Sequence, residues 1–287
     1  LKKFMRGKTI ITYLPDGNPK GIKICEMPTS IVKGILIPRN KLNEVSKHID
    51  LSKVGIYFLL SEKEDLDVPY VYIGEGEDLI KRIKQHDIQS QEYWNFAIAF
   101  ISDKENINKA HVKFLENHCY HEAKNYGRCL LKNSVIPTKS SLTDQERDFV
   151  LDFFDELRIL LGNLGHPLFE AHPEMEETEL FYCTGKDAKG VGTLTEEGFI
   201  VYNASTANLL ESPSAGSWLI NMREKLVREG FLEEKDDKLI FSKSVEFNSP
   251  SAAAGVVLAR RANGWTEWKT KEGKTLDELK RQENKEK

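Results

Sequence analysis

The chain has 287 residues, more than one compact domain usually holds, so two domains are expected. Its 40% hydrophobic and 30% charged residues exclude the disordered and fibrous classes. No apolar run approaches the roughly 20 residues of a membrane helix, and the first residues lack the apolar core of a secretory signal. We therefore expect no membrane contact and a cytoplasmic location. The four cysteines are widely scattered, which favours reduced thiols over disulfides or a zinc site.

The net charge of −4 is unevenly distributed along the chain. Residues 1–50 hold ten Lys and Arg against four Asp and Glu, whereas residues 142–180 hold two against eleven. A basic N-terminal segment can attract a phosphate backbone, because lysine and arginine supply much of the affinity of proteins for nucleic acid. The charge pattern therefore permits a nucleic-acid partner without demanding one.

Residues 1–50 predict a β-rich N-terminal lead-in. The segments 8–15, 22–27 and 31–38 combine alternating and β-branched residues in the manner of short strands. The turn residues DGNPKG separate the first two of them.

Residues 51–165 combine strand and helix patterns. Apolar, aromatic and β-branched residues at 54–60 and 68–74 predict two adjacent antiparallel strands, and 94–102 predicts a third. Three helices are also expected. The first has an apolar face formed by Leu79, Ile80 and Ile83, and the second, within 105–125, has an apolar stripe formed by Val112, Leu115, Cys119 and Ala123. The third is a long amphipathic helix that begins with the capping box of Thr143 and Glu146.

An acidic stretch at 166–179 contains two prolines and lacks periodicity, so it predicts a linker. We expect an accessory domain over 180–287. The tetrapeptide SPSA occurs there twice, at 212–215 and 249–252, each time before a helix-like run. Serine as N-cap with proline at the first helical position explains both copies, and a true internal repeat is the alternative.

Several short motifs follow one another in the central region. They are GIY at 55–57, YIG at 72–74, Arg82 with His86 on one predicted helix, and Glu116 on a later helix. In this order and spacing they resemble the GIY-YIG nuclease family, over about residues 52–135. The resemblance implies a small nuclease domain that hydrolyses phosphodiester bonds with the help of a metal ion.

Glu116 is the expected metal ligand. It falls on the apolar stripe of its predicted helix, where an ionised carboxylate is costly unless it is paired or binds a metal. By the resemblance it holds one Mg²⁺ or Mn²⁺ ion. The alternative is a carboxylate at the edge of the stripe that pairs with a lysine.

Arg82 and His86 are four residues apart, which places them on one helix face, expected to be distinct from that of Leu79 and Ile83. The resemblance assigns phosphate binding to Arg82, and a permanently charged guanidinium suits that role. Without the resemblance, a solvated surface arginine is the simpler interpretation. His86 can relay a proton near neutral pH, or it can serve only as a favourable residue at a helix end.

Tyr57 and Tyr72 correspond to the paired tyrosines of the family, and the resemblance implies that Tyr57 is the general base. A phenol with an ordinary pKa of about 10 is a poor base at pH 7, so Tyr57 needs a nearby cation or must pass its proton onward. Packing in the core is the alternative for both rings. Gly55 and Gly74 are expected to permit close backbone approach. Asn133 matches the late asparagine of the family.

The sequence departs from the family in the segment between the two tyrosines. Fourteen residues separate Tyr57 from Tyr72, and the insert SEKEDLDV is acidic. This longer hairpin is expected to reshape the approach to DNA.

A wider resemblance, over nearly the whole chain, is to a bacterial and archaeal subgroup of the family that carries a C-terminal domain of unknown function, the DUF4357 type. It rests on the segments 14–22 and 152–170 and on a third segment, 247–276. The third segment lies in the expected accessory domain. It places Trp265 and Trp268 near Arg260 and Arg261, and rings interleaved with cations can stack bases and hold phosphate. Tryptophans packed in a core are the alternative.

The sequence therefore predicts an α+β protein within the broad α/β class, with a small module whose mixed or antiparallel sheet is flanked by helices. Its predicted activity is that of a metal-dependent endonuclease, with DNA as the expected substrate and RNA as a second candidate. A homodimer is a candidate state, because two copies often cut the two strands of a duplex. The alternative functions are a catalytically silent nucleic-acid-binding module and a protein-interaction adaptor.

Overall fold

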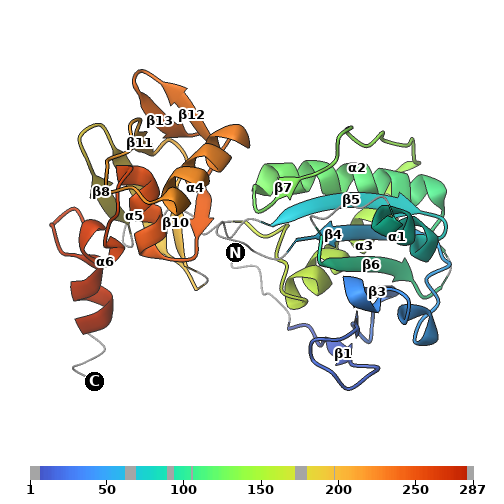
Figure 1. The fold of residues 1–287 in the computed structure, drawn as a ribbon. Coiled ribbons are helices and arrows are strands. Elements are labelled where there is room, and N and C mark those ends of the chain that lie inside the picture. The colour runs from blue at the N-terminus through green and yellow to red at the C-terminus, as the bar shows by residue number, and fades with distance from the viewer. Residues whose placement is uncertain are drawn as a thin grey trace, which may run out of the picture. The chain divides into compact units, whose positions relative to one another are not determined.

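The structure is a computed structural model that describes residues 7–61, 69–88, 94–104, 106–171, 180–196 and 198–282. The chain separates into two compact units, with the division between Glu170 and Ala171. Most of the expected linker at 166–179 and nearly all of the acidic insert at 61–68 lie outside the described residues. Each unit combines a mostly antiparallel sheet with helices, which confirms the predicted α+β class (Figure 1).

All four cysteines are free and buried, as the sequence suggests. None of the helices within the described ranges is long and apolar enough to cross a membrane.

The N-terminal unit is built on a seven-stranded sheet in the order β1-β2-β3-β6-β4-β5-β7. Neighbouring strands are antiparallel, except that β5 and β7 are parallel. The strands are β1 (Ile11–Tyr13), β2 (Lys23–Glu26), β3 (Val32–Pro38), β4 (Gly55–Leu60), β5 (Tyr70–Gly76), β6 (Phe96–Ser102) and β7 (Leu130–Leu131). The helices are α1 (Leu79–Ile88), α2 (Lys109–Tyr126) and α3 (Asp144–Asn163), with short 3₁₀ turns η1 (Arg39–Lys41) and η2 (Val45–Lys47).

The N-terminal lead-in does not form a domain of its own. Strand β3 pairs with β6 along its full length, so the lead-in strands continue the sheet of the central module. The reason lies in the sequence of β3, which is apolar at nearly every position and buried on both faces. Such a strand cannot remain at a solvent-exposed edge and instead occupies the interior of a sheet.

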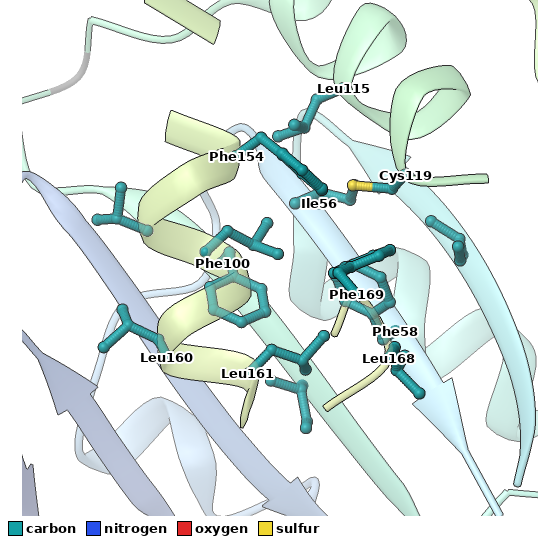
Figure 2. Close-up of a cluster of buried hydrophobic side chains, with 14 of the residues drawn as sticks. Ile56, Phe58, Phe100, Leu115, Cys119, Phe154, Leu160, Leu161, Leu168 and Phe169 are labelled. Carbon is teal, nitrogen blue, oxygen red and sulfur yellow. The ribbon is translucent and has the colours of Figure 1, made fainter. Parts of the chain in front are cut away.

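One face of this sheet is covered by α2 and α3 (Figure 2). Strand residues Ile56, Phe58 and Phe100 pack there against helix residues such as Leu115 and Phe154. The four residues of the predicted stripe on α2 are all buried, which confirms that helix and its orientation. The predicted capping box of α3 is also present, because Thr143 accepts from the Glu146 amide while the Glu146 carboxylate accepts from the Thr143 amide.

The opposite face holds a second apolar cluster, which contains Tyr57 and Leu59 of β4 together with Leu79 and Ile83 of α1. Successive residues of a strand point to opposite faces, so Tyr57 lies on the α1 side while Ile56 and Phe58 lie on the α2 side. This alternation assigns Tyr57 to the same side of the sheet as α1.

The C-terminal unit contains a second seven-stranded sheet, in which all pairs are antiparallel. Its strands are β8 (Phe181–Thr184), β9 (Lys189–Leu194), β10 (Phe199–Val201), β11 (Thr206–Asn208), β12 (Leu232–Lys235), β13 (Lys238–Phe241) and β14 (Val245–Phe247). Its helices are α4 (Ser217–Arg228), α5 (Pro250–Leu258) and α6 (Gly264–Glu267), followed by a π-helical turn η4 (Glu278–Gln282).

The two SPSA copies differ in structure. Ser249 is the N-cap of α5 and Pro250 is its first residue, as expected, because the Ser249 hydroxyl accepts from the amide of Ala252. The expectation is wrong for the first copy, which lies in a turn before α4. Helix α4 begins only after Gly216, and Gly216 has no side chain with which to cap it.

Candidate active site

The candidate site lies where strand β5 extends beyond its short neighbour β7. Strand β7 pairs only with Tyr70 and Val71, so the rest of β5 up to Gly76 lies beyond this parallel pairing. Helix α2 runs along β5 at this edge, and α1 follows β5 directly in the chain (Figure 1). The end of β5 is therefore reached by side chains from both helices.

Tyr57, Tyr72 and His86 form a cluster of three rings on the α1 side of the sheet. The Tyr57 hydroxyl and Nε2 of His86 share a hydrogen bond of 2.8 Å. The ring centroids of Tyr72 and His86 are 4.7 Å apart, and those of the two tyrosines are 6.2 Å apart. Tyr57 and His86 are buried, whereas Tyr72 is half-buried. A proton can thus pass between Tyr57 and His86 without leaving the protein.

Gly74 makes room for this cluster. In the β4–β5 register it lies directly opposite Tyr57. A Cβ atom at Gly74 would collide with the Tyr57 hydroxyl and would lie 2.8 Å from Cε1 of Tyr72. Gly55, the first residue of β4, has a comparable role, since a Cβ there would collide with the Phe100 carbonyl oxygen and lie 2.7 Å from Leu79 Cδ1. Both glycines permit the close approach that the sequence suggests.

The environment of Tyr57 keeps its hydroxyl protonated. Burial is the main cause that raises the Tyr57 pKa above its ordinary value, and the negative charge of Glu116 adds to it. Burial likewise raises the pKa of Tyr72. The guanidinium of Arg82 acts in the opposite direction and lowers the pKa of both hydroxyls. Arg82 is therefore near both tyrosines, although its own side chain is exposed.

Glu116 projects from α2 as a half-buried carboxylate. Burial first, and the charge of Glu75 second, raise its pKa to about 7, although the charges of Lys109 and Arg82 act in the opposite direction. Within the part of the chain that the structure describes, its carboxylate makes neither a hydrogen bond nor an ion pair. The alternative pairing with a lysine is therefore not formed among these residues, and the Glu116 carboxylate keeps its oxygens free of hydrogen bonds and ion pairs there.

An ion pair between Lys109 and Glu75 joins α2 to β5. Nζ of Lys109, the first residue of α2, lies 2.7 Å from Oε2 of Glu75, whose side chain is only 11% exposed. Both residues line a polar hollow of about 290 Å³ that also includes Arg82 and Gln85. The sequence argument missed this pair, although a glutamate directly after YIG and a lysine at the start of the second helix were visible signals.

Asn133 fixes the position of the YIG segment. Its side-chain amide donates to the Ile73 carbonyl at 2.7 Å and accepts from the Ile73 amide at 3.0 Å. The side chain thus pairs with β5 as a neighbouring strand would, just beyond the end of β7. Asn133 holds the backbone between Tyr72 and Gly74 and does not itself join the ring cluster.

The expected division of the α1 faces is wrong for His86. His86 is buried together with Leu79 and Ile83, whereas Arg82 is exposed. Residues 79, 83 and 86 are spaced by four and three, which is the spacing of one helix face. His86 therefore lies on the apolar face, where its Nε2 meets Tyr57, and Arg82 lies at the rim.

Residues 181–280 match the family described as a domain of unknown function (DUF4357). The match covers the C-terminal unit from the first residue of β8, so that unit is the DUF4357-type domain that the sequence predicts. No curated protein and no solved structure matches the chain.

In the DUF4357 domain, the two expected tryptophans are not equivalent. Trp268 is fully buried, its ring centroid lies 4.4 Å from that of Phe199, and its indole nitrogen donates to the Pro250 carbonyl. Of the two interpretations of this residue, packing in the core therefore holds for Trp268, because its ring is not accessible to a nucleic acid. Trp265 is half-buried. Arg260 pairs with Glu267 at 2.7 Å, and Arg261 is exposed.

Proposed function

We propose that the N-terminal unit is a GIY-YIG-type nuclease and that the protein is a metal-dependent endonuclease with DNA as its substrate. The observation that carries the proposal is the hydrogen bond between Tyr57 and His86. Near it lie the exposed Arg82 and the half-buried Glu116, whose carboxylate has no hydrogen-bond or ion-pair partner in the described part of the chain. The resemblance to the family over about residues 52–135 assigns chemistry to these same residues. Their arrangement gives each assignment a physical basis.

The proton path begins at Tyr57. Because its pKa is raised, Tyr57 cannot accept a proton from water as a free phenolate at neutral pH. It can instead pass its own proton to Nε2 of His86 at the moment it takes one from the attacking water. His86 is then the ultimate proton acceptor, and Tyr57 is the group that touches the water.

Arg82 supplies the positive charge for the phosphate. Its guanidinium is exposed at the rim of the ring cluster, close enough to lower the pKa of both tyrosine hydroxyls. A phosphodiester held there would lie next to Tyr57 and would have its transition-state charge offset by the guanidinium. Tyr72, half-buried beside His86, would orient the substrate.

Glu116 fits a divalent cation such as Mg²⁺ or Mn²⁺. Magnesium is commonly held by one or two carboxylates together with water and substrate phosphate, so a single accessible carboxylate is a sufficient protein ligand. The carboxylate of Glu116 has no hydrogen-bond or ion-pair partner among the described residues, and its raised pKa is the result expected where the surroundings stabilise a negative charge poorly. A bound cation would supply Lewis-acid stabilisation of the phosphate and the leaving oxygen.

The test is a cleavage assay on supercoiled, linear, branched and single-stranded DNA and on RNA, with Mg²⁺, Mn²⁺ or EDTA. We expect metal-dependent cleavage that is lost in Glu116→Ala and in Arg82→Ala. Glu122→Ala, a carboxylate on the same helix, is the matched control and should cleave normally. Cleavage that persists unchanged in Glu116→Ala would overturn the proposal. Binding without cleavage under all conditions would favour a silent nucleic-acid-binding module.

A further inference from the structure

The DUF4357 domain contains a pocket of about 570 Å³ that the proposed nuclease chemistry does not use. It lies between the start of α4, the turn that leads into α5, and the segment that follows α5. Its volume falls within the range of about 300–1,000 Å³ that is usual for small-molecule sites. Both SPSA copies contribute to it, through Ser214 in the first and Ser249 and Ser251 in the second.

Small residues keep this pocket open. Helix α5 presents Ser251, Ala252 and Gly255 to the pocket, and Leu219 of α4 forms its apolar lining. A Cβ atom at Gly255 would already be 3.4 Å from Leu219 Cδ1, so a larger residue at this position would extend into the space between the two helices. The pocket is therefore a consequence of the small side chains of α5.

The charge of the pocket is positive. Arg260 and Arg261 line it, and no acidic residue does so among the described residues. Arg260 is partly neutralised by Glu267, but the exposed guanidinium of Arg261 has no ion-pair partner in the described part of the chain. Helix α4 also begins beside the pocket without a side-chain cap, so its first amides add further partial positive charge. An anionic ligand is therefore favoured.

The pocket also offers an aromatic surface. Trp218, the second residue of α4, lines it and remains 40% exposed, although large aromatic rings are usually buried. An indole and a guanidinium that line the same pocket can together hold a ligand whose planar heterocycle stacks on the indole and whose negative charge pairs with the guanidinium. The combination suits a ligand that is both aromatic and anionic.

We infer that this pocket binds a nucleoside monophosphate unit, with the base stacked on Trp218 and the phosphate held by Arg261. The unit can be a free nucleotide or one residue of a single strand, since both present the same base and phosphate. The sequence argument named Arg261 as a possible nucleic-acid contact but not Trp218, which lies fifty residues before Trp268.

The test uses the full chain in EDTA, so that binding is measured without metal-dependent cleavage. Free nucleoside monophosphates are titrated by calorimetry, and a fluorescein-labelled oligothymidylate is titrated by anisotropy. We expect Trp218→Ala to weaken binding about tenfold or more, and Trp218→Phe to retain most of it. Arg261→Gln should weaken binding and lower the slope of log K against log salt for the strand by about one.

The matched control is Arg228→Gln, which removes an exposed arginine from the far end of α4. It should leave both affinities unchanged. Binding of either the free nucleotide or the strand that depends on Trp218 and Arg261 supports the inference and identifies the source of the unit. Absence of binding by the wild-type chain, or equal affinities in wild type, Trp218→Ala and Arg261→Gln, would overturn it. Thermal unfolding of each variant should match wild type, because both side chains are at the surface.

Discussion

The hydroxyl of Tyr57 on β4 lies 2.8 Å from Nε2 of His86 on α1, and both side chains are buried. A buried phenol with a raised pKa is a weak base by itself. Paired with an imidazole, it becomes one half of a proton relay, because the imidazole nitrogen can accept the proton that the phenol gives up. The two residues are therefore expected to act together, so that loss of either one removes most of the contribution of proton transfer to the cleavage rate.

Tyr57→Phe removes the hydroxyl that contacts the attacking water. We expect cleavage to fall by a factor of about 10² or more, because positioned proton transfer contributes about that much. Stability should fall by about 1–3 kcal/mol, since Nε2 of His86 loses its partner in a buried place. Initial rates on a sensitive DNA substrate and urea unfolding measure the two effects. Tyr13→Phe, an exposed tyrosine on β1, is the control. Activity of Tyr57→Phe near the wild-type rate would contradict the relay.

Gly74→Ala tests whether the ring cluster needs a residue without a side chain opposite Tyr57. The added Cβ would collide with the Tyr57 hydroxyl, so we expect a loss of about 1–3 kcal/mol in unfolding free energy and a large loss of cleavage. Gly76→Ala is the matched control on the same strand, because its Cβ would make only ordinary contact, 3.4 Å from Cβ of Arg82. The measurement is the midpoint of thermal unfolding, which should be lower for Gly74→Ala than for Gly76→Ala. Equal midpoints would show that β5 shifts to accommodate a methyl group at position 74.

Asn133→Ala should act on the site through the backbone of Ile73. It removes both hydrogen bonds of the side-chain amide, and we expect a cost of about 1–3 kcal/mol together with reduced cleavage. Asn133→Asp keeps the acceptor for the Ile73 amide, but it turns the donor into a carboxylate oxygen that faces the Ile73 carbonyl oxygen. Because two acceptors repel each other, its effect should be at least as large as that of Asn133→Ala. Hydrogen exchange at the Ile73 amide is the specific measurement. Protection that is unchanged in Asn133→Ala would rule out this positioning role.

Much of the fold follows from local patterns in the sequence. The stripe on α2, the capping box of α3 and the adjacent strands β4 and β5 are all encoded by spacing within a few residues, and the structure confirms them. Local patterns do not predict that the lead-in strands join the sheet of the central module. That connection depends on the pairing of β3 with β6, which are separated by about sixty residues, and no local signal specifies such a partner.

The candidate site shows the same limit. The motif spacing identified Tyr57, Tyr72, Arg82 and Glu116, but not which of them would touch. The burial of His86 against Tyr57 required the packing of α1 on the sheet, and the pair of Lys109 with Glu75 required the course of α2 along β5. In the DUF4357 domain, the exposure of Trp218 and the burial of Trp268 are properties of packing, so composition near the arginines could not decide between an exposed and a core tryptophan.

Glu116 is expected to make the N-terminal unit less stable as pH rises. Its pKa is raised from 4.5 to about 7, so the folded state binds the proton more tightly than the unfolded state does. The unfolding free energy therefore falls as pH rises through this window, by an amount on the order of 2 kcal/mol. Glu116→Gln carries no such charge, so it should match wild type at pH 5 and be the more stable protein at pH 8.

Millimolar Mg²⁺ or Mn²⁺ should raise the stability of wild type at pH 8, but not that of the variant, because only an ionised carboxylate gains from the cation. Urea unfolding of both proteins at the two pH values measures this dependence. If the two unfolding free energies differ by the same amount at pH 5 and pH 8, Glu116 is ionised at both values, and burial does not raise its pKa into this window.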